Sequence, residues 1–130
     1  MKGEVLAWAP AVVWVLALAG LSRMTGVPEP LQPFTILSDK VIHFGLYSVL
    51  GVALGWARLA SRRTPSHLFM VALGSLYGAL DEYHQSFVPG RTPEVGDWVA
   101  NTLGVLAGYA LFTLVIAPRS NHFNRTTGDA

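Results

Sequence analysis

The sequence predicts an all-α integral membrane protein, a four-helix bundle of transmembrane helices with both termini in the cytoplasm. Hydrophobic residues make up 52% of the chain even before its 13 glycines are counted, whereas soluble domains reach about 45–50% with glycine included. Charged residues make up only 13%. Four apolar stretches near membrane length, separated by turn residues, complete the pattern. The 130 residues fit one membrane domain over residues 1–118, followed by a polar C-terminal tail over residues 119–130.

The first apolar stretch, residues 5–21, contains no charged side chain. About 20 helical residues cross a hydrocarbon core of about 30 Å, so this stretch predicts a spanning helix. An alternative is that the stretch is a secretory signal, because Ala17-Leu18-Ala19 resembles a small-residue cleavage site. Glu4 interrupts the basic start that such a signal carries, and further apolar stretches follow. These two observations favour a retained first helix over a cleaved one.

Residues 22–38 are predicted to form a connector, because proline interrupts a regular helix and this segment contains Pro28, Pro30 and Pro33. Ser38 is expected to cap the second helix, with Asp39 in its first turn, where a carboxylate is favoured by the helix dipole. The second helix then continues as an apolar segment to about residue 60.

Prolines also mark the starts of the third and fourth helices. Pro65 and Pro93 each follow a threonine cap and suit the first position of a helix. The third helix has an apolar stretch of only 13 residues, from Leu68 to Leu80, and judged alone it could be a buried helix of a soluble protein. If it continues to Ser86 it reaches membrane length, and its last turns carry charged residues. The fourth is predicted to remain apolar through Ile116.

The distribution of charge predicts the orientation in the membrane. Four spans place both termini and the basic turn at 61–64 on one side, which collects Lys2, Arg58, Arg62, Arg63, Arg119 and Arg125, whereas the other side holds Arg23, Lys40 and Arg91. Basic residues concentrate on the cytoplasmic side of a membrane protein. We therefore expect a multi-pass protein of the inner (cytoplasmic) membrane with cytoplasmic termini. The extracytoplasmic side then holds most of the acids: Glu29, Asp39, Asp81, Glu82, Glu94 and Asp97.

Polar residues recur at helical spacing on three of the predicted helices. The stripes are Asp39, His43 and Tyr47, then Tyr77, Asp81, His84 and Gln85, and then Glu94, Asp97, Asn101, Gly104 and Gly108. All three are richest at the same membrane face, which predicts one polar site there. Tyr47 is interpreted as an interfacial aromatic residue, and the two glycines as helix-packing positions. A structural alternative is that the network only fixes helix register.

The residue types at this site suggest acid–base chemistry on an anionic ligand. Asp81 or Glu82 with His84 is the preferred catalytic acid–base pair, because crowded carboxylates beside an imidazole suit proton transfer. Lys40 and Arg91 are expected to hold a phosphate or carboxylate. The predicted substrate-binding residues are Asp39, Lys40, His43, Gln85, Arg91, Asp97 and Asn101.

Other kinds of site receive less support. Asp39, His43, Asp81, His84 and Asp97 have metal-ligating side chains, but their spacing matches no metal motif, so no metal is assigned. The chain has no cysteine, no glycine-rich phosphate loop and no basic stripe that would bind nucleic acid. Neither a cofactor nor an oligomeric state follows from the sequence.

Three functions remain open from these residues. The first is a small membrane enzyme acting on an envelope lipid or a lipid-linked, phosphorylated substrate. The second is a non-enzymatic accessory or binding protein that captures an envelope ligand, an antibiotic or a partner. The third, less favoured, is a component of a proton- or ion-linked carrier, for which four short spans would need to oligomerise.

Three motif blocks resemble the VanZ-like family of small bacterial membrane proteins. They are Asp39-Lys40-x-x-His43-Phe44-x-x-Tyr47, then Asp81-Glu82-x-x-Gln85-x-Phe87-x-Pro89-Gly90-Arg91, and then Asp97-x-x-x-Asn101-x-x-Gly104, within a motif core over residues 38–108. The founding member of the family lowers sensitivity to the lipoglycopeptide teicoplanin. The resemblance therefore implies a membrane protein of the cell envelope and a role in antibiotic resistance. His84 and Glu94 are less typical of the pattern.

Overall fold

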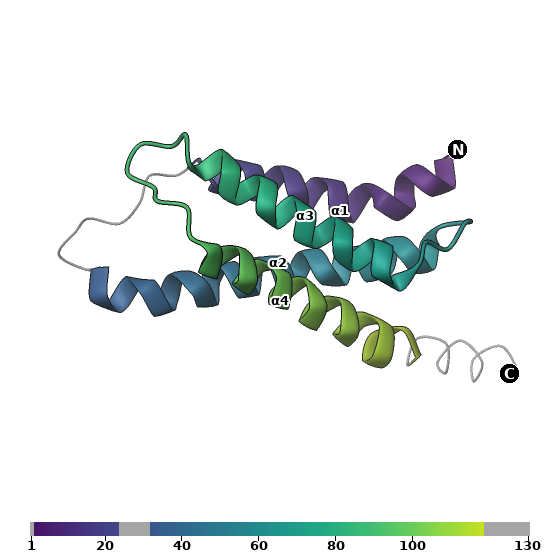
Figure 1. The fold of residues 1–130 in the computed structure, drawn as a ribbon. Helices are drawn as coiled ribbons and strands as arrows, with labels where there is room; N and C mark the ends of the chain where they lie inside the picture. The colour runs from purple at the N-terminus through teal and green to yellow at the C-terminus, as the bar shows by residue number, and fades with distance from the viewer. Residues whose placement is uncertain (1, 24–31, 119–130) are drawn as a thin grey trace, which may run out of the picture.

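The computed structural model describes residues 2–23 and 32–118, which form four helices that run in alternating directions (Figure 1). They are α1 (Lys2–Leu21), α2 (Gln32–Ala60), α3 (His67–Gln85) and α4 (Val95–Leu111), the last continuing into the π-helical turn η2 (Phe112–Ile116). The start of α1, the turn between α2 and α3 and the end of η2 lie at one end of the bundle. The loop between α3 and α4 lies at the other end, called here the site end. The predicted polar tail, residues 119–130, lies outside the described residues.

The predicted all-α architecture is confirmed, and three of the helices are long and apolar enough to cross a membrane. These segments are Gly3–Leu21, Asp39–Ala60 and Val95–Ile116. The fourth helix, α3, has 19 residues and is not among them, because its composition falls short of that standard. A crossing by α3 therefore remains a proposal.

The start of α2 differs from its prediction. The helix begins at Gln32 rather than after Ser38, so part of the expected connector is helical. Pro33 is tolerated because it lies in the first turn, where its missing N–H has no intrahelical acceptor to lose. Ser38 is consequently an interior helix residue and not a cap.

The starts of α3 and α4 each lie two residues later than predicted. The N-cap of α3 is Ser66, whose side-chain oxygen accepts a hydrogen bond from the N–H of Phe69 at 3.1 Å. The N-cap of α4 is Glu94, which makes no side-chain cap bond. In both places the proline lies just before an extended N-cap residue rather than inside the helix.

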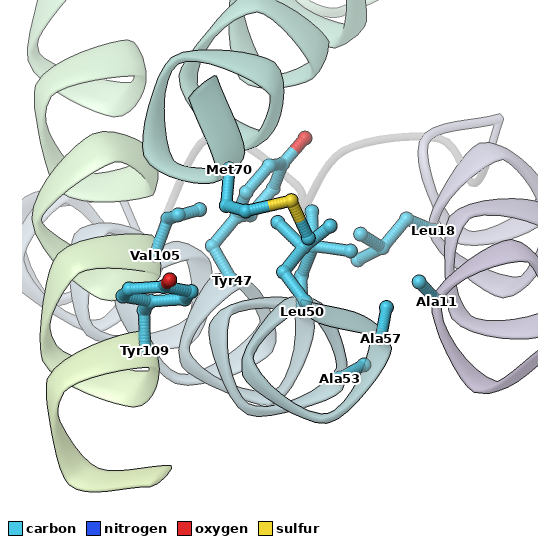
Figure 2. Close-up of a cluster of buried hydrophobic side chains, with 10 residues drawn as sticks. Ala11, Leu18, Tyr47, Leu50, Ala53, Ala57, Met70, Val105 and Tyr109 are labelled. Carbon is cyan, nitrogen blue, oxygen red and sulfur yellow. The ribbon is translucent and has the colours of Figure 1, made fainter. Parts of the chain in front are cut away.

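Helix α2 is the centre of the bundle, and all three other helices pack against it. Figure 2 shows apolar side chains from the four helices meeting over α2, among them Ala11, Leu18, Leu50, Met70, Val105 and Tyr109. Two side-chain hydrogen bonds connect α1 to its neighbours. Trp14 Nε1 donates to the carbonyl of Leu46 on α2 at 2.8 Å, and Tyr77 Oη on α3 donates to the carbonyl of Val15 at 3.0 Å. The opposite surfaces of the helices expose large apolar side chains, as a bilayer requires.

Glycines bring the backbones of α2 and α4 into close contact. A Cβ atom added at Gly104 would collide with the backbone oxygen of Phe44, and one at Gly108 with that of Ser48. Small residues at a helix interface allow this approach in membranes. The predicted packing role of these two glycines is confirmed, and the contact fixes how the polar ends of the two helices face each other.

We expect Gly108→Ala to lower the free energy of unfolding by about 1–3 kcal/mol, because the added methyl group overpacks a backbone contact. Gly45→Ala is the matched control, since nothing lies within 4 Å of a Cβ at that α2 position. Unfolding of both variants in detergent micelles measures the difference. Equal stability of the two variants would contradict the close approach of α2 and α4.

Candidate functional site

A cluster of buried polar side chains occupies the site end of the bundle. Seven such residues come from three helices and the end of α1: Ser22, His43, Asp81, Glu82, Gln85, Asp97 and Asn101. Buried polar groups are costly inside a membrane protein unless they are paired or line a site. The structure therefore brings together most of the residues that the three sequence stripes singled out.

Asp81 receives hydrogen bonds from three different elements. The hydroxyl of Ser22, at the end of α1, donates to its Oδ1. The hydroxyl of Tyr47 on α2 donates to Oδ2 at 3.0 Å, and Nε2 of Gln85 donates to the same oxygen at 3.4 Å. A carboxylate surrounded by donors in this way is oriented rigidly and joins α1, α2 and α3.

Asn101 is fully buried and bridges the histidine and a carboxylate. Its Oδ1 lies 3.0 Å from Nδ1 of His43 and accepts the ring N–H, while its Nδ2 donates to Oε1 of Glu82 at 3.4 Å. Gly78 makes room for this bridge, because a Cβ there would lie 3.0 Å from that of Asn101. The other oxygen of Glu82, Oε2, is buried and accepts no hydrogen bond of normal geometry from the described residues.

Lys40 is bound to two carboxylates of α4. Its Nζ lies 2.8 Å from Oε2 of Glu94 and 2.9 Å from Oδ1 of Asp97. Gly96 allows this crossing, since a Cβ there would lie 3.0 Å from the Lys40 Cε. The predicted role of Lys40 in holding an anion stays a prediction, but in this arrangement its charge is already matched by two acids.

Arg91 lies on the loop between α3 and α4, just after Gly90, whose φ of 82° is a conformation that glycine adopts readily. Its Nη1 donates to Oε1 of Gln85 across a long 3.4 Å, and its buried Nε has no partner among the described residues. No described acidic side chain lies within 4.0 Å of it, although the surroundings are rich in acids. Arg91 is thus a half-buried cation whose donors are largely unused.

The structure does not bring His84 into the cluster. Its side chain is exposed near the end of α3, whereas Asp81, Glu82 and Gln85 are buried. His84 precedes Gln85 by one residue, which rotates its side chain by about 100° around the helix axis, away from the buried face. His43 is the histidine that lies among the carboxylates. The catalytic role predicted for His84 stays a prediction. Among the described residues, no acidic side chain lies within 4.0 Å of the His84 ring nitrogens.

The sequence interpretation misjudged the role of one residue of the site and missed another. Tyr47 is not an interfacial aromatic: it is 1% exposed and binds Asp81. Its position four residues after His43 places it on the same face of α2 as the site, and this spacing could have indicated its role. Ser22 lies beyond the apolar stretch of α1 and carries no pattern that could have indicated its contact with Asp81.

An apolar cavity of about 280 Å³, open at the surface, lies between α1, α2 and α3. Its lining is wholly apolar and includes Trp8, Val12, Leu50, Leu73 and Tyr77. The ring of Tyr77 also lies 6.2 Å from that of Tyr47, centroid to centroid. One lining residue, Tyr77, therefore lies next to Tyr47, whose hydroxyl binds Asp81.

Comparison with known proteins agrees with the motif resemblance. The model of the VanZ/LLP1 family matches residues 8–116, which contain every residue of the polar cluster. The chain is also 32% identical over 93 residues to an uncharacterized protein of the fission yeast Schizosaccharomyces pombe. The match covers 72% of this chain and 54% of the yeast protein, so the chain spans about half of the length of that relative. No solved structure matches. The chain belongs to the VanZ/LLP1 family.

Proposed function

We propose that the protein is a small membrane enzyme that binds the phosphate group of an envelope lipid, or of a lipid-linked substrate, at the site end and acts on it. The observation that carries this proposal is Arg91, a half-buried guanidinium without a carboxylate partner among the described residues. Arginine binds phosphate through two parallel hydrogen bonds, and Nε with one Nη supplies that pair of donors.

The two adjacent carboxylates supply groups for proton transfer next to the bound phosphate. Asp81 is held by donors from Ser22, Tyr47 and Gln85. Glu82 keeps a buried oxygen with no partner of normal geometry, and this oxygen is the one that can take or return a proton. Gln85 links the two functions, because it contacts both Asp81 and Arg91. Neighbouring carboxylates in different surroundings commonly divide such roles.

The apolar cavity supports a lipid as the substrate. A hydrocarbon tail in the cavity between α1 and α3 would extend toward Tyr77 and Tyr47 and so toward Asp81. Binding sites for amphipathic molecules combine such apolar walls with a few convergent polar groups.

The proposal includes the placement of the protein in the membrane. With α3 as a fourth span, the start of α1, the basic turn at 61–64 and the end of η2 share the cytoplasmic side, and the site end faces outward. The proposed location is the inner membrane of a bacterium.

A second candidate function is capture without turnover, as an accessory protein in teicoplanin-type resistance or envelope homeostasis. The pairing of Lys40 with Glu94 and Asp97 favours this candidate. Because the charge of Lys40 is already matched, Arg91 alone is left to bind a phosphate group. This candidate shares the anion site and differs only in the absence of a chemical step.

We expect Arg91→Lys to weaken binding of a long-chain lipid phosphate by roughly tenfold, because an ammonium cannot reproduce the two parallel bonds of the guanidinium. Arg62→Lys, in the exposed turn at the opposite end, is the matched control. Binding is measured for protein in nanodiscs with phosphatidic acid and with a polyprenyl phosphate. The same samples are assayed for conversion of the lipid.

Three results are informative. Weaker binding in Arg91→Lys alone, together with conversion by the wild type, supports the enzyme. The same loss of binding without any conversion supports the accessory protein. Equal binding by both variants and the wild type would remove Arg91 as the anion site and the proposal with it.

A further inference from the structure

Three side chains with metal-ligating atoms meet between α2 and α4: Asp39, His43 and Asp97. One carboxylate oxygen from each aspartate and one ring nitrogen of the histidine all lie within 4.8 Å of one another. Asp39 and His43 are one helical turn apart on α2, and Asp97 lies in the first turn of α4. All three are among the metal-ligating side chains that the sequence offers, but their spacing matches no motif because they come from two helices that are far apart in the chain.

The hydrogen bond from His43 to Asn101 determines which ring nitrogen is free. Nδ1 donates its proton to Oδ1 of Asn101 at 3.0 Å, since the Asn101 amide nitrogen is engaged with Glu82. Nε2 is therefore the ring nitrogen left for a ligand, and it lies 3.9 Å from Oδ1 of Asp39. Nδ1 also lies 3.8 Å from Oε1 of Glu82. Metal-bound histidines are held in this manner, with the second ring nitrogen donating to an oxygen.

The charges around these residues also call for a cation. Among the described residues, the site end carries five carboxylates, Asp39, Asp81, Glu82, Glu94 and Asp97, but three cationic side chains, Arg23, Lys40 and Arg91. Three of the carboxylates are buried. Buried charges are retained where they are paired or bind metal. The His43 side chain itself is only 9% exposed, and its Nε2 has no hydrogen-bond partner among the described residues.

We infer that Asp39, His43 and Asp97 bind one divalent transition-metal ion, of the zinc or manganese type. One imidazole nitrogen and two carboxylates favour these ions over calcium and magnesium, which prefer oxygen ligands alone. Three protein ligands leave a coordination position open, as in catalytic rather than structural metal sites. The inference rests on the proposed function for its role, which is to bind a phosphate oxygen of the lipid and offset its charge.

Small movements bring the three ligands into coordination. Two atoms bound to one zinc ion at about 2.0–2.2 Å each are at most about 4 Å apart, so a spacing of up to 4.8 Å must contract by no more than roughly an ångström. Asp39 can supply this movement because its side chain is 43% exposed. Lys40 Nζ contacts Oδ1 of Asp97 as well as Glu94, and the second carboxylate oxygen of Asp97 remains available to bind the ion.

The test uses the metal alone. Purified full-length protein in detergent, stripped with a chelator, is titrated with MnCl2 while free Mn²⁺ is followed by electron paramagnetic resonance, and ZnCl2 is then added as a competitor. We expect one saturable site per chain from which Zn²⁺ displaces Mn²⁺. Asp39→Asn should weaken it at least about tenfold, because loss of a supporting group alone costs 10–100-fold. His43→Gln should have a similar effect.

The matched control is His84→Gln, which removes the exposed histidine at the same end of the bundle and should leave metal binding unchanged. Because Asp39 is partly exposed, its variant is expected to fold, and unfolding curves without metal verify this. Absence of saturable binding by the wild type, or equal binding by Asp39→Asn, would overturn the inference. Lipid phosphate binding through Arg91 is measured without metal, so either outcome leaves the proposed anion site to be judged separately.

Discussion

Asp81→Asn is expected to abolish conversion of the lipid phosphate, lowering its rate by roughly 10²–10⁴-fold, the contribution typical of a positioned acid or base. The substitution preserves the shape of the side chain but removes its negative charge. The charged carboxylate accepts the hydrogen bonds from Ser22, Tyr47 and Gln85. The two hydroxyl groups can rotate to accept from the new amide, so the protein is expected to fold. The conversion assay in nanodiscs, with unfolding curves for the same samples, separates the two effects.

Glu4→Gln provides the control for Asp81→Asn. Glu4 lies at the opposite end of the bundle, where its Oε1 accepts from the backbone N–H of Arg62 at 2.6 Å. The loss of one exposed carboxylate there should leave conversion unchanged. Full activity in a folded Asp81→Asn variant would exclude Asp81 from the chemistry.

Asn101→Leu is expected to have the largest effect on stability, lowering the free energy of unfolding by about 3–5 kcal/mol. Asn101 is 0% exposed and bonds both His43 and Glu82. Leucine would fill a similar volume but leave a buried ring nitrogen and a buried carboxylate without their partner. Equilibrium unfolding in mixed micelles measures the change.

Thr102→Val is the matched comparison for Asn101→Leu. Thr102 is the next residue on α4 and makes a single, half-buried bond to Ser75 at 2.9 Å. Interhelical bonds of this kind contribute about 0.6 kcal/mol on average, so this variant should lose far less. A loss in Asn101→Leu no greater than that of Thr102→Val would show that the bridge does not hold the cluster together.

The helices and the convergence of the polar stripes could be predicted because both follow from local periodicity. Asp97, Asn101, Gly104 and Gly108 lie three or four residues apart, and the structure buries all four on one face of α4. The helical spacing also placed Asp39 and His43 on a common face of α2. Long apolar runs with few charges fixed the membrane character of the chain in the same way.

The features that the sequence did not reveal depend on contacts between helices. The role of Tyr47 depends on Asp81, and that of Ser22 depends on where α1 ends beside α3. His84 shows the converse, since a residue of suitable chemistry next to the carboxylates in the chain points away from them in space. The start of α2 was predicted too late because Pro33 was interpreted as a helix breaker. In the sequence, a proline in the first turn of a helix cannot be distinguished from a proline that ends one.

The most direct test of the account is whether the polar ends of α2 and α4 meet in the native membrane. The chain contains no cysteine, so paired substitutions report on proximity without background. Asp39→Cys combined with Asp97→Cys should be joined in high yield by a short bifunctional thiol reagent, because one carboxylate oxygen of Asp39 lies within 4.8 Å of one of Asp97. Val41→Cys combined with Asp97→Cys, which places one thiol on the exposed face two residues away, should not be joined. Equal yields from the two pairs would contradict the convergence on which the site depends.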